Sequence, residues 1–288
     1  MSELNNIRLR IDQIDKMPAM PMMAQKVLEL HAKPERDVLA LAKVIELDPS
    51  LSAQVIRYAS SSLYGYRGKV DSPEAAISRV LGYDTVINLV LGIAVAKPFN
   101  LPHNGPLGLD AFWSHAVYSA ILCQKLALAM PQSKRPAPGL AYLAGLLHNI
   151  GALVLGHIFP TEFDMLNSFL AANPHKHFTD SEREVFGESH DKVGAWLLHN
   201  WQLPPQLVMA CLNHHEAQTS HPHAVYATIC YVADHLLKRN NIGDAESGEL
   251  APQVLQSLNI TEEIALELAQ EVMDKAQDLE AIIKQFAA

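Results

Sequence analysis

Residues 139–159 read GLAYLAGLLHNIGALVLGHIF, an apolar stretch with His148 and Asn149 near its centre. Its apolar residues recur at helical spacing, and helical periodicity dominates the rest of the chain as well. Convincing alternating strands are absent, and a hairpin dipeptide of the Asn-Gly kind occurs only at Asn104-Gly105, beside prolines. We therefore expect an all-α protein.

Side chains that cap helices precede several of the apolar segments, and Pro49 and Pro73 stand at the first position of two of them. A short polar side chain accepts hydrogen bonds from the free N–H groups of a helix start, and proline fits there because its missing N–H is not needed. We expect helices to begin after these residues: Asp37, Asp48, Ser72, Asp84, Asp110 and Thr261.

Loop-forming residues divide the chain into three parts. The stretch KPFNLPHNGP, residues 97–106, breaks the helical pattern, and residues 240–248 are expected to form a loop. We expect an N-terminal helical part over residues 1–106, a helical bundle over residues 107–240, and a C-terminal part over residues 241–288 with two amphipathic helices. The N-terminal helices should pack onto the bundle and share a continuous core with it.

The composition narrows the classes of function. Of 288 residues, 49% are hydrophobic and 18% are charged, which allows a large buried core or a surface that meets a partner. The net charge is −9, and Lys and Arg are nowhere concentrated. A protein that binds nucleic-acid phosphates usually carries a basic face, so the charge argues against nucleic-acid binding as the main task.

The N-terminal segment, the apolar stretches and the cysteines indicate the cellular compartment. The N-terminus has no apolar signal core, and the apolar stretches from Val86 to Ala96 and from Leu140 to Leu155 are too short or too interrupted by glycine to cross a bilayer. The three cysteines form no CxxC pair and lie in apolar runs, which is typical of buried thiols in a reducing compartment. We expect a cytoplasmic protein without a membrane partner.

Two histidines and one carboxylate lie inside apolar helical segments. His115 and His148 are on separate segments, and Asp234 stands in YVADHLL. A buried polar group without a partner costs a few kcal/mol, and a buried carboxylate needs a cation. A bound metal would satisfy all three side chains, and separately hydrogen-bonded imidazoles, or an imidazolium beside the carboxylate, would serve as well.

Further histidines follow in a recognisable order: His190 opens a helical segment, and His214 and His215 end the next one. This order resembles the motif of the HD superfamily of metal-dependent phosphohydrolases, and in particular the bacterial HDOD group. The segments that resemble the HDOD group are residues 17–30, 45–65, 70–91 and 188–204.

This resemblance covers about residues 14–240 and implies an N-terminal helical part packed on an HD-type bundle. It also implies a metal site formed by His115, His148, Asn149, His190, His214, His215 and Asp234. The metal would be divalent, with Fe, Mn or Zn as candidates. Glu184 and Glu188 precede His190 and could support the site, although exposed charges at a helix start explain them better.

Three departures from the family pattern bear on activity. The family has aspartate where Asn149 stands, and an amide offers one neutral oxygen instead of a negative charge. The lysine of the active hydrolases is replaced by Ala152, and the GYP loop is missing after Glu216. With Asp234 as the sole carboxylate, the charge balance favours one metal ion over two, or an empty site.

The resemblance together with these departures favours a signalling or regulatory module with little or no hydrolase activity. It would bind signalling proteins, and its pocket could sense a metal or bind a nucleotide or a phosphodiester. The alternative is a working metal-dependent phosphohydrolase, in which a bound divalent ion activates a water molecule. The sequence assigns no catalytic residue in either case.

Overall fold

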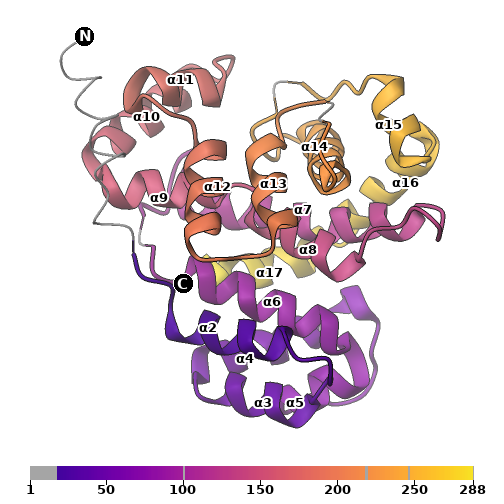
Figure 1. Cartoon of the computed structure of the whole chain (residues 1–288). Coiled ribbons are helices and arrows are strands. Elements are labelled where there is room, and N and C mark those ends of the chain that lie inside the picture. Colours follow the sequence, from indigo (N-terminus) through magenta and orange to yellow (C-terminus); the bar gives the residue numbers. More distant parts are fainter. Residues whose placement is uncertain (1–17, 100, 218–219, 246, 288) are drawn as a thin grey trace.

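The structure is a computed structural model that describes residues 18–99, 101–217, 220–245 and 247–287 (Figure 1). Within these ranges the regular secondary structure is helical and includes no strand, which confirms the all-α prediction. Residues 1–17, for which the sequence predicts no signal segment, lie outside the described residues.

The N-terminal helices form the lower layer in Figure 1 and begin largely where their caps predict. The Asp37 and Ser72 side chains each accept a hydrogen bond from the backbone N–H three residues ahead, and Asp48 accepts from Ser50 and Leu51. The elements are α2 (Met22–His31), α3 (Val38–Glu46), α4 (Pro49–Ala59), η1 (Ser62–Tyr64), α5 (Pro73–Ala76), the π-helical turn η2 (Ile77–Leu81) and α6 (Tyr83–Ala96).

Two predicted caps are wrong because each helix begins one residue before the acidic side chain, which is two residues earlier than a cap at that position requires. Gly82 precedes α6 with a φ of 77°, and Asp84 lies in the first turn, where it pairs with Arg36 at 2.9 Å. Gly108 precedes α7 (Leu109–Ala129), and Asp110 again lies in the first turn. Both carboxylates therefore interact with the positive end of the helix without capping it.

The second half is built around α7, which packs against α8, α14, α16 and α17. Thr261 caps α16 as predicted, but the chain after residue 251 forms three helices where two were expected, because the helical run breaks again after Met273. The elements after α7 are α8 (Pro138–Leu147), α9 (Ile150–Ile158), α10 (Pro160–Ala172), α11 (Phe178–Phe186), α12 (His190–Asn200), α13 (Pro205–Asn213), α14 (Ala224–Lys238), α15 (Pro252–Leu258), α16 (Glu262–Met273) and α17 (Ala276–Ala287).

The last helix joins the two halves. α17 packs against both α4 and α7, and Figure 1 shows it between the lower and upper layers. The Phe286 ring lies 6.4 Å from the Tyr58 ring and 5.3 Å from the Trp113 ring, measured between centroids. One connected core includes residues of all three predicted parts, as expected for the N-terminal part and the bundle. The boundaries at residues 106 and 240 stay predictions.

The apolar stretch that opened the sequence analysis is a core element. Residues Pro138–Ile158 are long and apolar enough to cross a membrane by length and composition alone, whereas the sequence analysis expected this region to be too short or too interrupted by glycine. However, 78% of its most apolar window is buried inside the protein. Packing against α7, α6 and α13 therefore accounts for its composition.

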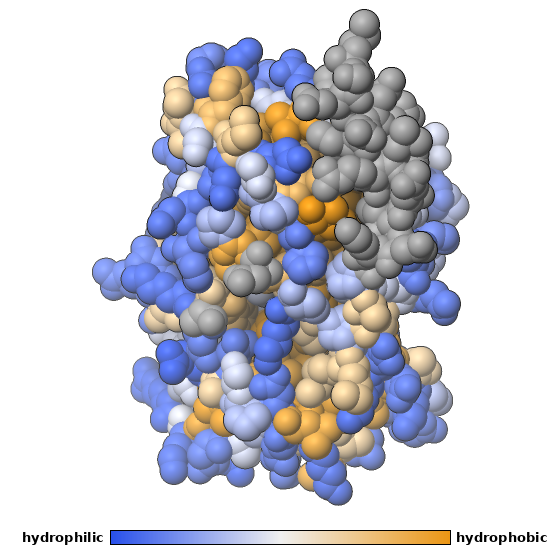
Figure 2. Space-filling model, turned by 90° about the vertical axis from the view of Figure 1, so that its left-hand side faces the viewer, coloured by the Kyte–Doolittle hydropathy of each residue, from blue (hydrophilic) through white to orange (hydrophobic). Residues whose placement is uncertain are grey.

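The three cysteines are buried free thiols, as the sequence predicts. On the surface, Figure 2 shows orange areas between blue ones on the face that it presents. Orange areas also occur at the lower end of this view, where the N-terminal helices lie. Leu39 and Leu47, at α3 and its end, are more than half exposed.

Candidate metal centre

Helices distant in sequence bring the first group of predicted site residues together. α7 carries His115, the corner between α8 and α9 carries His148, and α14 carries Asp234. His115 Nε2 lies 2.9 Å from Asp234 Oδ1, and His148 Nε2 lies 3.4 Å from the same oxygen. All three side chains are buried, so the carboxylate and the two imidazoles share one enclosed space.

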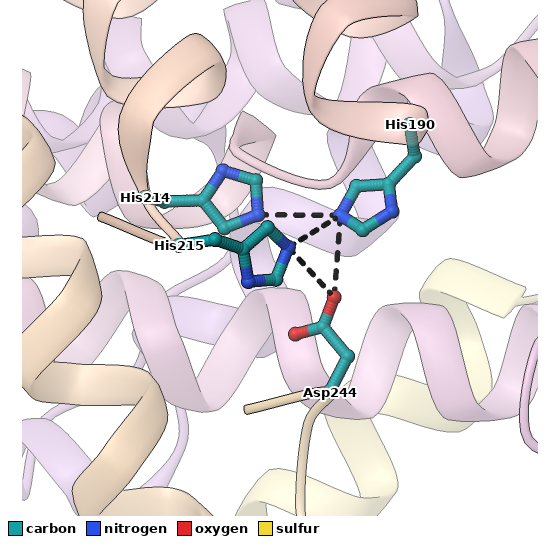
Figure 3. Close-up of side chains that lie close together, drawn as sticks. All are labelled: His190, His214, His215 and Asp244. Carbon is teal, nitrogen blue, oxygen red and sulfur yellow. Dashed lines mark hydrogen bonds and ion pairs between the residues drawn. The ribbon is translucent and has the colours of Figure 1, made fainter. Parts of the chain in front are cut away.

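The other three imidazoles form a second group (Figure 3). His190 is the first residue of α12, and His214 and His215 directly follow α13. His190 Nε2 lies 3.2 Å from His214 Nε2 and 3.1 Å from His215 Nε2. The His214 ring lies 4.9 Å from the ring of His148, so the two groups adjoin.

A close approach of two helices places His190. An alanine Cβ at Gly151 of α9 would fall on the carbonyl oxygen of His190, and it would lie 2.6 Å from the backbone nitrogen of Gly194. Backbone contact at this distance is open only to glycine. The glycine therefore sets the spacing between α9 and α12, and with it the spacing between the two groups of imidazoles.

A second carboxylate, Asp244, belongs to both groups and was not predicted. It comes from the loop after α14, and Figure 3 shows it opposite the second group of imidazoles. Its Oδ2 lies 3.2 Å from His190 Nε2 and 3.6 Å from His215 Nε2, and it accepts a hydrogen bond of 3.2 Å from Asn149 Nδ2. A loop residue has no helical periodicity, so the pattern that identified Asp234 could not identify Asp244.

Glu182 of α11 is the other site residue that the sequence analysis missed. It is 1% exposed, and its Oε2 accepts hydrogen bonds from the backbone nitrogen of His190 at 2.9 Å and from His190 Nδ1 at 2.7 Å. A signal was present, because Glu182 lies midway between Phe178 and Phe186 at four-residue spacing and therefore on the apolar face of its helix.

The two carboxylates that the sequence analysis named as possible supports of the site, Glu184 and Glu188, do not contact His190 in the way that Glu182 does. Glu184 is exposed, and Glu188 forms an ion pair of 3.0 Å with Lys192 one turn along. The preferred interpretation, exposed charges at a helix start, fits neither residue fully: Glu184 is exposed but lies in the last turn of α11, and Glu188 precedes α12 but is only partly exposed.

The backbone and Glu182 orient three of the imidazoles. Nδ1 of His148 lies 2.7 Å from the carbonyl oxygen of Gly145, and Nδ1 of His214 lies 2.7 Å from that of Cys211. A carbonyl oxygen only accepts, so each Nδ1 carries a hydrogen and each Nε2 of a neutral ring presents a lone pair. Metal-binding histidines are held in the same way.

The pKa shifts of His148, His214 and Asp244 suit a metal site. Burial and the neighbouring His215 ring hold the pKa of His214 well below its usual value, and burial lowers the pKa of His148. Burial opposes ionisation of Asp244, but the rings of His215 and His190 outweigh it and hold the pKa of this carboxyl well below its usual range. Neutral imidazoles and an ionised carboxylate are the forms that bind metals. Burial also opposes protonation of His115 and His190, but Asp234 outweighs it at His115 and Glu182 at His190, and the pKa of both rings is raised, so these two rings must lose a proton before they bind a metal.

Several buried ligand atoms have no hydrogen-bond partner among the described residues. They are His148 Nε2, Asn149 Oδ1, Asp234 Oδ2 and Asp244 Oδ1. Two sets of four ligand atoms each lie within 4.8 Å of one another: His190, His214, His215 and Asp244 in one, and His115, His148, Asp234 and Asp244 in the other. Unpartnered acceptors at such distances repel unless a cation lies between them, so the residues fit divalent metal.

The family-model comparison agrees with this arrangement, since the model of the HDOD domain matches residues 17–217. The chain belongs to the HDOD domain family. The match includes His115, His148, His190, His214 and His215, whereas both carboxylates of the two sets, Asp234 and Asp244, lie beyond its end.

Solved structures show the same fold. A protein of Marinobacter aquaeolei VT8 described as a "Putative signal transduction protein" is 30% identical with a TM-score of 0.86, over 100% of this HDOD chain and 66% of the other. A "Putative phosphohydrolase" of Shewanella amazonensis SB2B is 23% identical with a TM-score of 0.74, over 97% of each chain.

Among curated proteins, an uncharacterized protein of Treponema pallidum (strain Nichols) is 24% identical over 214 residues. The match covers 74% of this HDOD chain and 39% of the relative. The chain therefore spans less than two thirds of this relative and of the Marinobacter protein.

A cavity of about 520 Å³ opens beside the metal-ligand sets of this HDOD chain. Its lining includes His115, His190 and Asp244, and also Lys176 and Lys238. Ala152 lines the same cavity. Lys176 and Lys238 therefore bring positive charge to this cavity.

Proposed function

We propose that this HDOD chain is a signalling module that holds divalent metal between its buried imidazoles and carboxylates and acts by binding partner proteins. The observation that carries the proposal is the set of buried, unpartnered ligand atoms around His148, Asp234 and Asp244. The family membership and the name of the Marinobacter relative support a signalling role.

The metal part of the proposal has a direct test. Protein purified from cultures supplied with Fe, Mn and Zn is expected to contain stoichiometric metal by elemental analysis. Chelation should lower the melting temperature by roughly 5 °C or more, because an ion that binds only the folded state stabilises it.

A pair of variants controls this measurement. His148→Ala should lose both the metal and the chelation effect, whereas His31→Ala, at the exposed end of α2, should keep both. The metal centre would be ruled out if the wild-type protein contained no metal and its melting temperature were the same with and without chelator.

The cavity favours a second function, hydrolysis of a phosphate ester. A bound divalent ion would supply Lewis-acid activation of a water molecule and of a phosphoryl oxygen. The residues of the chain would supply the rest: Lys176 and Lys238 line the cavity, and neither forms an ion pair with another described residue. They are free to hold an anionic group beside the ligand sets.

One assay distinguishes the two functions. As a signalling module, the protein loaded with Fe, Mn or Zn should turn over p-nitrophenyl phosphate, bis-p-nitrophenyl phosphate and cyclic dinucleotides no faster than His148→Ala. Turnover that His148→Ala abolishes, and for which Lys238→Ala raises KM while Lys69→Ala does not, would establish the hydrolase instead. Lys69 is an exposed residue outside the cavity lining.

A further inference from the structure

We propose that Asp244 takes over the role of the carboxylate that is missing at Asn149 and serves as the shared ligand of two divalent ions. The proposal rests on the metal-binding function above and makes it specific. One ion position would use His190, His214 and His215, and the other His115, His148 and Asp234, as the two sets of ligand atoms are divided.

The position of Asp244 supports a shared ligand. It is the one residue common to both sets. Its Oδ2 faces His190 and His215, at 3.2 and 3.6 Å from their Nε2 atoms, whereas its Oδ1 lies 3.9 Å from Nδ1 of His115. The side chain is 7% exposed, and Oδ1 has no hydrogen-bond partner among the described residues. A carboxylate can use its two oxygens for two ions, which an imidazole cannot do.

Asn149 is positioned to support this exchange of roles. Its Nδ2 donates a hydrogen bond of 3.2 Å to Asp244 Oδ2 and lies 3.1 Å from Nδ1 of His115. An aspartate at position 149 could not donate this bond in its ionised form and would face Asp244 as a like charge. The amide and the carboxylate are therefore complementary. The carboxylate stands in the loop after α14 instead of at the corner between α8 and α9, and the hydrogen bond from Asn149 holds it in place.

The backbone of the loop that carries Asp244 fixes the position of this residue beside His115. Gly243 has a φ of 90°, and a Cβ at this residue would lie 2.6 Å from His115 Nε2, so the backbone passes directly against that ring. Ala245 is buried on the other side of Asp244. Arg239 Nε donates a hydrogen bond of 2.7 Å to the carbonyl oxygen of Gly248, which ties the two ends of the loop together.

The added carboxylate changes the charge balance. The expectation of a single ion depended on Asp234 as the sole carboxylate among neutral imidazoles. With Asp244, each set of four ligands contains at least one carboxylate. Two divalent ions would then be held with two carboxylates, Asp234 and the shared Asp244, instead of one.

The test is a charge-swap series with metal content as its readout. We expect about two ions per chain in the wild type, as in two-metal sites. We expect about one in Asp244→Asn, because the set of His190, His214 and His215 then has no carboxylate ligand. The double variant Asn149→Asp/Asp244→Asn reverses the amide and the acid and should regain the second ion. Glu249→Gln, an exposed carboxylate of the same loop, should match the wild type.

A binding measurement makes the series independent of purification losses. Competition with a chelator should show Mn²⁺ binding to the second position at least about tenfold weaker in Asp244→Asn and restored in the swap variant. Circular dichroism checks that each variant is folded. If Asp244→Asn fails to fold, the swap variant, which keeps an amide–carboxylate pair, decides the question.

The outcomes separate this inference from the metal proposal. If Asp244→Asn binds as much metal as the wild type, if the wild type saturates at one ion, or if the swap variant fails to recover the second ion, the shared-ligand proposal is wrong while the metal centre stands. If the wild type binds no metal, both proposals fail.

Discussion

Replacing Gly151 with alanine is expected to lower the free energy of unfolding by about 3 kcal/mol, the upper part of the range for overpacked cores. The new methyl group would fall on the carbonyl oxygen of His190 and within 2.6 Å of the backbone nitrogen of Gly194. Neither atom can turn away as a side chain can, so α9 and α12 must separate. The separation would also move His190 away from His148, so metal content should fall together with stability.

Chemical denaturation of the metal-free protein measures the stability term, and elemental analysis measures the metal. Gly92→Ala in α6 is the matched control, since its new methyl group meets the side chain of Leu146 instead of backbone. A side chain can adjust, and alanine has the better helix propensity, so we expect a loss below about 1.5 kcal/mol and unchanged metal content. Equal losses in the two variants would show that the contact between α9 and α12 does not set the helix spacing.

The sequence predicted the helical fold because its signals are local. Asp37, Asp48, Ser72 and Thr261 cap helices within three residues of themselves, and such a bond depends little on the rest of the chain. Asp84 failed as a predicted cap because the preceding Gly82 adopts a φ of 77° and the helix begins immediately after it. A backbone angle of this kind is not encoded by spacing alone.

The distinction between local signals and features that depend on the folded chain also applies to the site. His115, His148 and Asp234 could be predicted because a polar residue stands out inside an apolar helix, and the structure places the three side chains together. Asp244 could not, because a loop acid resembles any solvent-exposed acid until the loop is folded against His115. Glu182 fell between the two cases, since its helical spacing was visible but its partner His190 was on another helix.

Truncation of His190 is expected to have the second large effect. His190→Ala removes the imidazole that contacts Glu182, His214 and Asp244, and it leaves the Glu182 carboxylate, 1% exposed, without a cationic side chain. Breaking a buried pair in this way costs about 3–5 kcal/mol. Urea unfolding in the presence of chelator isolates this term from the loss of metal, and His199→Ala, on the exposed face of the same helix, should change stability by less than about 0.5 kcal/mol.

A double-mutant cycle tests whether the uncompensated carboxylate is the cause. Glu182→Gln alone keeps a side-chain oxygen for His190 Nδ1 and should cost only about 1 kcal/mol, the usual value of one hydrogen bond. The double variant buries no charge at position 182, so its loss should be smaller than the sum of the single losses by about 1–3 kcal/mol. Additive losses would mean that His190 stabilises the protein by packing alone. Glu182 would then serve only to orient the ring, and Glu182→Gln would still change metal affinity through that orientation.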